Sequence, residues 1–249
     1  MSVEFDLSDD VVLVTGAGGA LGSAVGRAFA DAGAAVCAAD VIPPDSEDYL
    51  FDADGAGADT YRADFTDEAA VADTVAAVVD AHGGIDVLCN IAGTWMGGDP
   101  VEDTDVGTFD ALFDVNLKTA FLAAKHALPH LQAAGGQGRE GTGAREQGAI
   151  VSVASRSSLS GGEGDAVYRA SKAGVRLLTE SLAEENRGTV RANAVMPSVI
   201  DTPMNREMMP DADFEAWVDP ADIAEVVRFL ASDAAGVTSG AAVPVYGEA

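Results

Sequence analysis

The stretch VVLVTGAGGALGSAVGRAFADAG, residues 11–33, decides the fold. It starts with an apolar run of the kind found in buried strands, passes through a glycine-rich turn, and continues as an amphipathic segment that ends near Gly33. A strand, a turn and a helix in this order form the first unit of an open α/β sheet, in which the helix N-terminus can bind a phosphate group. The stretch therefore predicts a phosphate-binding turn at the carboxyl end of the first strand.

The same alternation of apolar strands and amphipathic helices continues along the chain. Further strands are expected at 34–40, 59–64, 85–93, 149–155, 190–197 and 241–246. Helices are expected at 67–82, 103–133, 165–187 and 219–232. This order predicts an α/β protein, with a single-domain Rossmann fold over residues 1–249 and a doubly wound, parallel, seven-stranded sheet with helices on both faces.

Three segments have features of their own. The helix at 103–133 is expected to break near Pro129, and its apolar residues cover more than one face, which predicts a second face buried in a subunit contact. The glycine-rich, polar residues 134–148 predict a flexible surface loop. Residues 203–218 are expected to form a short substrate lid.

The charge balance is extreme, with 41 acidic residues against 14 basic ones and a net charge of −27. Such a surface repels nucleic acid and anionic membranes, so neither is expected as a partner. Our hypothesis is adaptation to concentrated salt, where a Debye length of ~3 Å at 1 M screens the self-repulsion. An ordinary acidic enzyme is the alternative.

The sequence also predicts a cytoplasmic protein. Its start, MSVEFDLSDD, lacks the basic and apolar regions of a signal peptide, and no 18 apolar residues run together. Cys37 and Cys89 fall in predicted strands. If those strands flank a common neighbour, they lie ~10 Å apart, too far for a disulfide, and buried free thiols suit a reducing compartment.

Asp40 supports a ligand-binding role for the glycine-rich turn, TGAGGALG at 15–22. This residue ends the predicted second strand, 24 positions after Gly16, where a carboxylate can bond the ribose hydroxyls of a dinucleotide and repel a 2′-phosphate. No Arg or Lys lies within the turn or directly after Asp40, which favours NAD over NADP. The alternative is a structural turn followed by a capping aspartate.

The segment YRASK, residues 168–172, sets Lys172 four positions after Tyr168. On a helix both side chains then share one face, where the ammonium can favour the ionised phenol. A tyrosine in this setting is a candidate for proton transfer. A solvated, uncoupled pair is the alternative.

With these pieces in place, the sequence resembles the classical short-chain dehydrogenase/reductase family nearly from end to end. The family's T-G-x-x-x-G-x-G turn matches TGAGGALG, with Ala20 in place of the middle glycine, and its N-N-A-G strand end matches CNIAG at 89–93. Its Y-x-x-x-K pair matches Tyr168 and Lys172. Ser198 replaces a usual glycine, and the tail VYGEA departs from V-D-G-G.

The resemblance implies roles for particular residues. The implied catalytic set is Asn116, Ser155, Tyr168 and Lys172, with Tyr168 moving the proton, Ser155 bonding the substrate oxygen, Lys172 holding the nicotinamide ribose and Asn116 anchoring a water. Asp64 is expected near the adenine amino group. The implied cofactor contacts are Gly16, Gly18, Gly19, Leu21, Gly22, Asp40, Asp64, Asn90, Gly93, Tyr168, Lys172, Pro197, Ile200 and Thr202. The family also implies a homotetramer, with a homodimer as the alternative.

The expected activity is an NAD-dependent oxidoreductase that transfers hydride between NAD and a secondary alcohol of sugar, polyol or hydroxyacyl type. The alternatives are a 3-oxoacyl-thioester reductase of the same family and a non-catalytic scaffold that senses dinucleotides. Candidates for lining the substrate pocket are Thr94, Trp95, Met96, Arg156, Ser157, Glu163, Met204, Met208 and Met209. For Met204, Met208 and Met209, filling gaps in a lid or an interface is the alternative. His126 and His130 have a zinc-compatible spacing but no apparent third ligand, so no metal is expected.

Overall fold

The computed structural model describes residues 7–134 and 147–248, which form a seven-stranded sheet. The strand order is β3-β2-β1-β4-β5-β6-β7, and every neighbouring pair is parallel. The strands are β1 Val11–Thr15, β2 Ala35–Asp40, β3 Asp59–Arg62, β4 Val87–Asn90, β5 Gly148–Val153, β6 Val190–Pro197 and β7 Ala242–Val245. Because the order reverses between β1 and β4, the predicted doubly wound sheet is confirmed.

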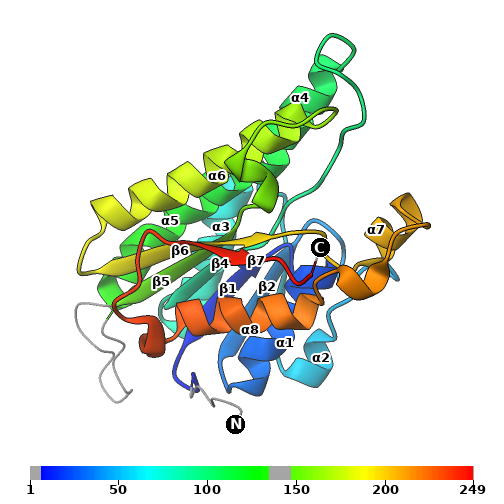
Figure 1. Ribbon diagram of the computed structural model, residues 1–249. Helices are drawn as coiled ribbons and strands as arrows, with labels where there is room; N and C mark the ends of the chain where they lie inside the picture. Colours follow the sequence, from blue (N-terminus) through cyan, green and yellow to red (C-terminus); the bar gives the residue numbers. More distant parts are fainter. Residues whose placement is uncertain (1–6, 135–146, 249) are drawn as a thin grey trace.

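Helices cover both faces of this sheet (Figure 1). α1 (Ala20–Asp31) and α8 (Pro220–Ala231) pack on one face, and α3 (Glu68–His82) and α6 (Ala166–Glu185) lie on the other. The residues of β1 alternate between the two cores. Those on one face are Val12 and Val14, and those on the other are Val11 and Leu13. This explains why the strand reads as a continuous apolar run.

The helical region between β4 and β5 is interrupted, but not at the predicted place. α4 spans Val106–Phe113, α5 spans Thr119–Ala134, and Asp114–Lys118 between them form a π-helical turn. The expected break near Pro129 is wrong, because this proline lies inside α5, where burial of Ala127 and Leu131 offsets the missing N–H. The irregular turn lies instead around the buried Asn116.

Apolar side chains remain exposed on this region. Phe109 is 46% exposed and stacks on Phe113, and Phe121 is 48% exposed. A subunit contact at this face stays a prediction. Residues 135–146 of the predicted surface loop lie outside the described residues.

Aspartates cap several helices of this acidic chain. Each accepts a hydrogen bond from a backbone N–H of the first turn, a position where a carboxylate also complements the helix dipole. The segments capped in this way include α2 (Ala53–Ala56), α3 and α8, and the capping residues are Asp52, Asp67, Asp105, Asp213 and Asp219. Part of the negative charge therefore stabilises secondary structure directly.

The two cysteines lie as expected. Cys37 in β2 and Cys89 in β4 flank β1, and both are buried and outside any disulfide. Among the helices that the structure describes, none is both long enough and apolar enough to cross a membrane.

Candidate active site

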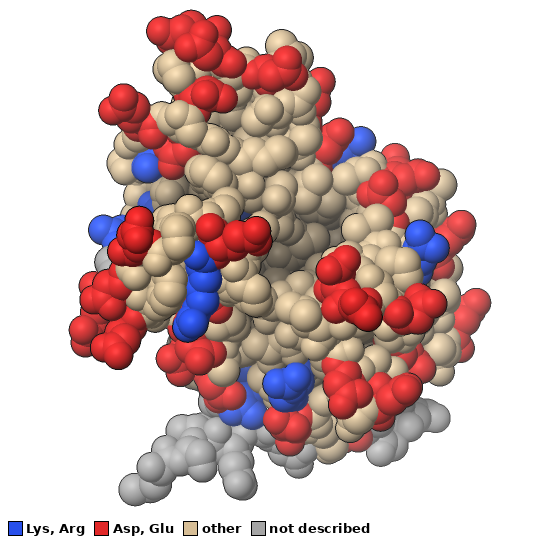
Figure 2. Space-filling model, turned by 90° about the vertical axis from the view of Figure 1, so that its right-hand side faces the viewer, with Lys and Arg blue, Asp and Glu red and all other residues tan. Residues whose placement is uncertain are grey.

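A cavity of about 1440 Å³ opens at the carboxyl ends of the strands. Its walls come from the turn after β1, the segments after β2 and β4, the short 3-10 turn Arg156–Leu159 after β5, and α6. The segment after β6, which leads into α7 (Pro203–Met208), completes it. Figure 2 shows a hollow of largely uncharged residues with acidic side chains on the surrounding surface.

Two glycines of the first turn leave no room for a side chain. Gly16 has a φ of +69°, and a Cβ there would lie 2.7 Å from the Cα of Ala92. A Cβ on Gly22 would lie 1.9 Å from the Gly16 carbonyl oxygen. Without side chains at these positions, the backbone of the turn can pack directly against neighbouring backbone. The start of α1 then faces the cavity. Ala20, which replaces the family's middle glycine, is accommodated as the first residue of α1.

Asp40 is buried at the end of β2, beside this turn. One carboxylate oxygen accepts the Gly18 N–H at 2.8 Å, and the other accepts the Ile42 N–H at 2.9 Å. These two bonds aim the carboxylate at the wall of the cavity, which Asp40 lines. Each oxygen keeps a second lone pair for a ligand hydroxyl.

The segment after β2 covers the turn in a way that the sequence did not predict. The Leu50 N–H donates to the Gly18 carbonyl at 2.8 Å, and the Tyr49 ring covers Gly18 closely enough to leave no space for a Cβ. Gly18 therefore does not line the cavity itself. Burial, followed by the nearby Asp40 charge, raises the pKa of Tyr49 to about 12. The run YLF within an acidic stretch is the only signal of this packing.

Lys172 lies buried on α6 with its ammonium in the cavity wall. Its Nζ donates to the Val153 carbonyl at 3.0 Å, and burial lowers its pKa to about 8. A Cβ on Gly93 would lie 2.9 Å from this Nζ and 3.0 Å from Oδ1 of Asn116. Gly93 thus brings the segment after β4 close to both polar side chains.

Tyr168 lies one helical turn before Lys172 and is hydrogen-bonded to the Ser155 side chain. Burial raises its pKa above the ordinary value, the Ser155 hydrogen bond lowers it, and Asp165 raises it further. In the chain without its cofactor, the phenol is thus held in the neutral form, and its ionisation with Lys172 and the oxidised nicotinamide nearby stays a prediction. Desolvation outweighs the Ser155 hydrogen bond and the Arg169 charge, both of which lower the pKa.

Asn116 binds protein atoms rather than facing an open site. Its Oδ1 accepts the Thr94 N–H at 2.8 Å, while its Nδ2 donates to the Thr94 carbonyl and to Ser171 Oγ, both at 3.0 Å. The carboxamide thus holds the segment after β4 against α6. This positions the loop that borders the cavity, and a role in anchoring a water stays a prediction.

The comparisons with known proteins agree with this geometry. The short chain dehydrogenase family matches residues 10–213. This chain belongs to that family. A cis-4-hydroxycyclohexanecarboxylate dehydrogenase from Sinomonas cyclohexanicum is 35% identical over 255 residues, covering 96% of each chain.

Two further relatives act on other substrates. The 3-oxoacyl-(acyl-carrier-protein) reductase FabG of Thermotoga maritima is 32% identical, covering 97% of this chain and 98% of its own. The solved aldohexose dehydrogenase of Thermoplasma acidophilum has a TM-score of 0.84 and 27% identity, covering 98% of this chain and 95% of its own. The short-chain dehydrogenase family thus fixes the reaction type as oxidoreduction, typically with NAD or NADP, and leaves the substrate open.

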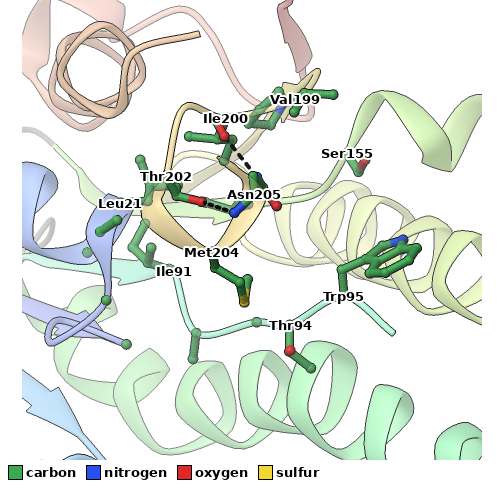
Figure 3. A pocket seen from close by; sticks show the side chains of 18 of the residues that line it. Leu21, Ile91, Thr94, Trp95, Ser155, Val199, Ile200, Thr202, Met204 and Asn205 are labelled. Atoms are coloured by element: carbon green, nitrogen blue, oxygen red, sulfur yellow. Dashed lines mark hydrogen bonds between the residues drawn. The ribbon is translucent and has the colours of Figure 1, made fainter. Parts of the chain in front are cut away.

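Most of the remaining residues predicted for this short-chain dehydrogenase line the cavity. They are Gly19, Leu21, Thr94, Trp95, Arg156, Ser157, Pro197, Ile200, Thr202, Met204, Met208 and Met209. Figure 3 shows several of these side chains from close by. The residues after β6 are fixed by Asn205, whose Nδ2 donates to the Ile200 carbonyl and whose N–H donates to the Thr202 hydroxyl.

A few predicted residues lie elsewhere in this short-chain dehydrogenase. Met96 and Glu163 are not among the residues that line the cavity, so both pocket assignments are wrong. Asp64 is also outside the wall, and its carboxylate accepts the Thr66 N–H and hydroxyl. Asn90 is buried below the wall, with its Nδ2 3.3 Å from Ser152 Oγ.

Of the two histidines with a zinc-compatible spacing, His126 has a partner within the chain. His126 lies 3.3 Å from the Glu68 carboxylate. Within residues 7–134 and 147–248 no cluster of three metal-ligating side chains occurs.

Proposed function

We propose that this chain is an NAD-dependent oxidoreductase that transfers hydride between NAD and a secondary alcohol of sugar, polyol or hydroxyacyl type. The observation that supports it most is that one cavity contains both residues suited to proton transfer and a turn suited to binding a nucleotide. The Ser155–Tyr168 pair and Lys172 line one part, and the glycine turn with Asp40 lines another. A dinucleotide fits this arrangement because the glycines of the turn leave only backbone, and no side chains, beside the N-terminus of α1.

Specific residues would hold the cofactor. The N-terminus of α1 with Gly16, Gly19 and Leu21 would bind the pyrophosphate, and Asp40 would bond the adenosine ribose. Lys172 would bond the nicotinamide ribose, with Ile200 and Thr202 near the carboxamide. When bound, NAD supplies the hydride acceptor.

Tyr168 and Ser155 perform the proton chemistry. The Ser155 hydroxyl donates a hydrogen bond to the substrate oxygen, and the Tyr168 oxygen takes the alcohol proton or returns it to the developing alkoxide. Because burial raises the pKa of Tyr168, the neutral phenol is ready to donate in the direction of ketone reduction. Alcohol oxidation requires added positive charge near the phenol, to which a protonated Lys172 contributes.

Two alternatives remain, and one assay separates them. A 3-oxoacyl-thioester reductase is favoured by the similarity to the Thermotoga maritima enzyme, and a dinucleotide-sensing scaffold would bind cofactor without turnover. The assay follows reduced nicotinamide absorbance in molar KCl, with NAD or NADP and a panel of alcohols, sugars, ketones and 3-oxoacyl thioesters. Preference for a thioester supports the first alternative. Cofactor binding without turnover of any panel member supports the second.

Asp40→Ser is expected to relax the preference for NAD. Removing the carboxylate removes repulsion of a 2′-phosphate, so the ratio of NADP to NAD affinity should rise about tenfold or more, which corresponds to ~1.4 kcal/mol. Calorimetric titration with both nucleotides measures this ratio. Asp45→Asn removes an equal charge from the same acidic segment and should leave the ratio unchanged. An unaltered ratio in Asp40→Ser would show that other residues select the cofactor.

Salt is expected to be required for the folded state. With a net charge of −27, self-repulsion in dilute buffer should unfold the chain, whereas molar KCl screens it. Circular dichroism and activity across a KCl series measure this. Full structure and activity without salt would contradict the halophilic proposal.

The titration of Lys172 predicts a pH dependence of stability. Its folded pKa of about 8 lies below the ordinary lysine value of 10.5, so the folded chain loses this proton at lower pH than the unfolded chain. Between these values the unfolded chain binds more protons, and the free energy of unfolding should rise with pH by roughly 3 kcal/mol from this residue. Denaturant titrations of wild type and Lys172→Met from pH 7 to 11 isolate the effect. Parallel curves for the two proteins would show that Lys172 is not desolvated.

We also propose the larger organisation of the protein. Residues 1–249 form one domain, and residues 203–218 act as the substrate lid. The apolar face with Phe109 and Phe121 lies in the contacts of a homotetramer or homodimer, and the protein works in the cytoplasm. Light scattering in molar KCl measures the subunit number.

A further inference from the structure

One wall of the cavity is apolar and largely exposed. No residue of α7 is buried, and Met204 and Met208 share a face of this helix because they are four positions apart. They are 52% and 42% exposed, and Met209 directly after them is 38% exposed. All three methionines line the cavity. Flexible thioether side chains in this position form an adaptable apolar surface.

Trp95 forms a second apolar surface of the cavity (Figure 3). The indole is 38% exposed and rests on Gly97, where an added Cβ would lie 3.0 Å from its Cζ2. The Gly98 N–H donates to the Gly164 carbonyl at 2.6 Å, which ties this loop to the segment just before α6. The indole is therefore held near the helix that carries Tyr168.

Several of the polar side chains around this space are engaged within the chain. A ligand with many hydroxyls needs a donor or acceptor for each one, since a buried hydroxyl without a partner opposes binding. Here the engaged pairs are Asn205 with the Ile200 carbonyl at 2.8 Å, Ser198 with the Tyr246 carbonyl at 2.6 Å, and Arg169 with Asp165 and with the Ser160 carbonyl.

The Arg156 side chain is also engaged within the chain. Its guanidinium lies 5.2 Å above the centre of the Tyr246 ring, toward the C-terminal segment. Ser155 and Tyr168 line the same cavity and are placed to bond the one reacting oxygen. The wall thus offers apolar contact on two sides, while several of its polar side chains already have partners within the chain.

We propose that the substrate is a secondary alcohol, or the matching ketone, on an apolar carbon skeleton without further hydroxyls, held between Trp95 and the methionines of α7. This rests on the proposed function and narrows its substrate range, because it excludes sugars and polyols. Ring-sized alicyclic alcohols suit a space with an aromatic face and a flexible apolar face.

A matched pair of six-membered rings tests this. Cyclohexanol and myo-inositol present the same ring and the same reacting CH–OH group, and they differ in five hydroxyls. With saturating NAD in molar KCl, the KM for cyclohexanol should be at least tenfold lower than that for myo-inositol. Turnover of myo-inositol with an equal or lower KM would overturn the substrate class while leaving the oxidoreductase function supported.

Two variants locate the effect in the wall. Met204→Gln/Met208→Gln keeps side-chain length but adds polar groups, and it should raise the KM for cyclohexanol about tenfold with little change in kcat. Met96→Gln makes the same replacement outside the cavity and should keep the wild-type KM. Equal KM values for the double variant and the wild type would also overturn the proposal.

Binding is measured separately from turnover. In Trp217→Phe, Trp95 is the remaining tryptophan, and its fluorescence should change on titration of the NAD complex with cyclohexanol but not with myo-inositol. If neither alcohol is oxidised, the proposed function loses support, and this titration alone decides the substrate class. Selective binding of cyclohexanol supports the apolar site, and no binding or equal binding overturns it.

Discussion

Tyr168→Phe should bind NAD with wild-type affinity and lose turnover by about 10²–10⁴-fold, the usual contribution of a general acid or base. The phenyl ring keeps the packing of α6 and removes only the oxygen that exchanges the proton. Lys172 still donates to the Val153 carbonyl, so the cofactor wall should be intact. The measurement combines calorimetric titration with NAD and initial rates in molar KCl.

Tyr61→Phe is the matched control for this variant. Tyr61 lies on β3, outside the cavity wall, where its hydroxyl interacts with Cys37. Loss of that hydroxyl should leave turnover unchanged. Wild-type rates in Tyr168→Phe would show that another group exchanges the proton, whereas equal losses in both variants would point to a general effect on folding.

Gly22→Ala should abolish cofactor binding at millimolar NAD. Its Cβ would lie 1.9 Å from the Gly16 carbonyl oxygen and 2.8 Å from the Cα of Ala17, and backbone must move to relieve the clash. Overpacking of this kind costs about 1–3 kcal/mol in well-packed sites. We therefore expect a lower free energy of unfolding in denaturant titrations and no calorimetric signal with NAD.

Gly19→Ala is the control for Gly22→Ala, because it adds the same methyl group at a position of the turn that has room for it. Gly19 lies in the same turn with a negative φ of −77°, and its Cβ would meet the Gly16 oxygen at 3.5 Å, an ordinary contact. This variant should bind NAD within about tenfold of wild type, or ~1.4 kcal/mol. Normal NAD affinity in Gly22→Ala would contradict the tight packing of the turn against α1.

The sheet and the main site elements could be predicted because their signals are local. Val11 to Val14 are apolar at every position since both faces of β1 are covered, and this run also identified the turn that follows it. Tyr168 and Lys172 were found from their four-residue spacing on one helix. Asp40 was found from its place at a strand end.

Other features depend on contacts between distant segments, which spacing does not encode. The π turn around Asn116 follows from bonds to Thr94 and Ser171, while Pro129, the local signal for a break, is tolerated by packing. The covering of Gly18 by Tyr49 likewise joins segments about thirty residues apart.

The pKa of Tyr168 shows the same limit. Lys172, four positions later on the same helix, argued for easier ionisation. Its burial under the rest of the fold raises the pKa instead. The sequence also does not show which polar pocket candidates are engaged within the chain, as Arg156 is above the Tyr246 ring.

Transfer of deuterium from a labelled alcohol tests the central claim most directly. The protein in molar KCl is given NAD and an apolar secondary alcohol with deuterium on the carbinol carbon, and the nicotinamide is examined by proton NMR. We expect deuterium at C4 of the reduced ring with wild type and Tyr61→Phe, and about 10²–10⁴-fold slower transfer with Tyr168→Phe. NAD binding by wild type without any deuterium transfer, across alcohols, sugars and polyols alike, would contradict the account.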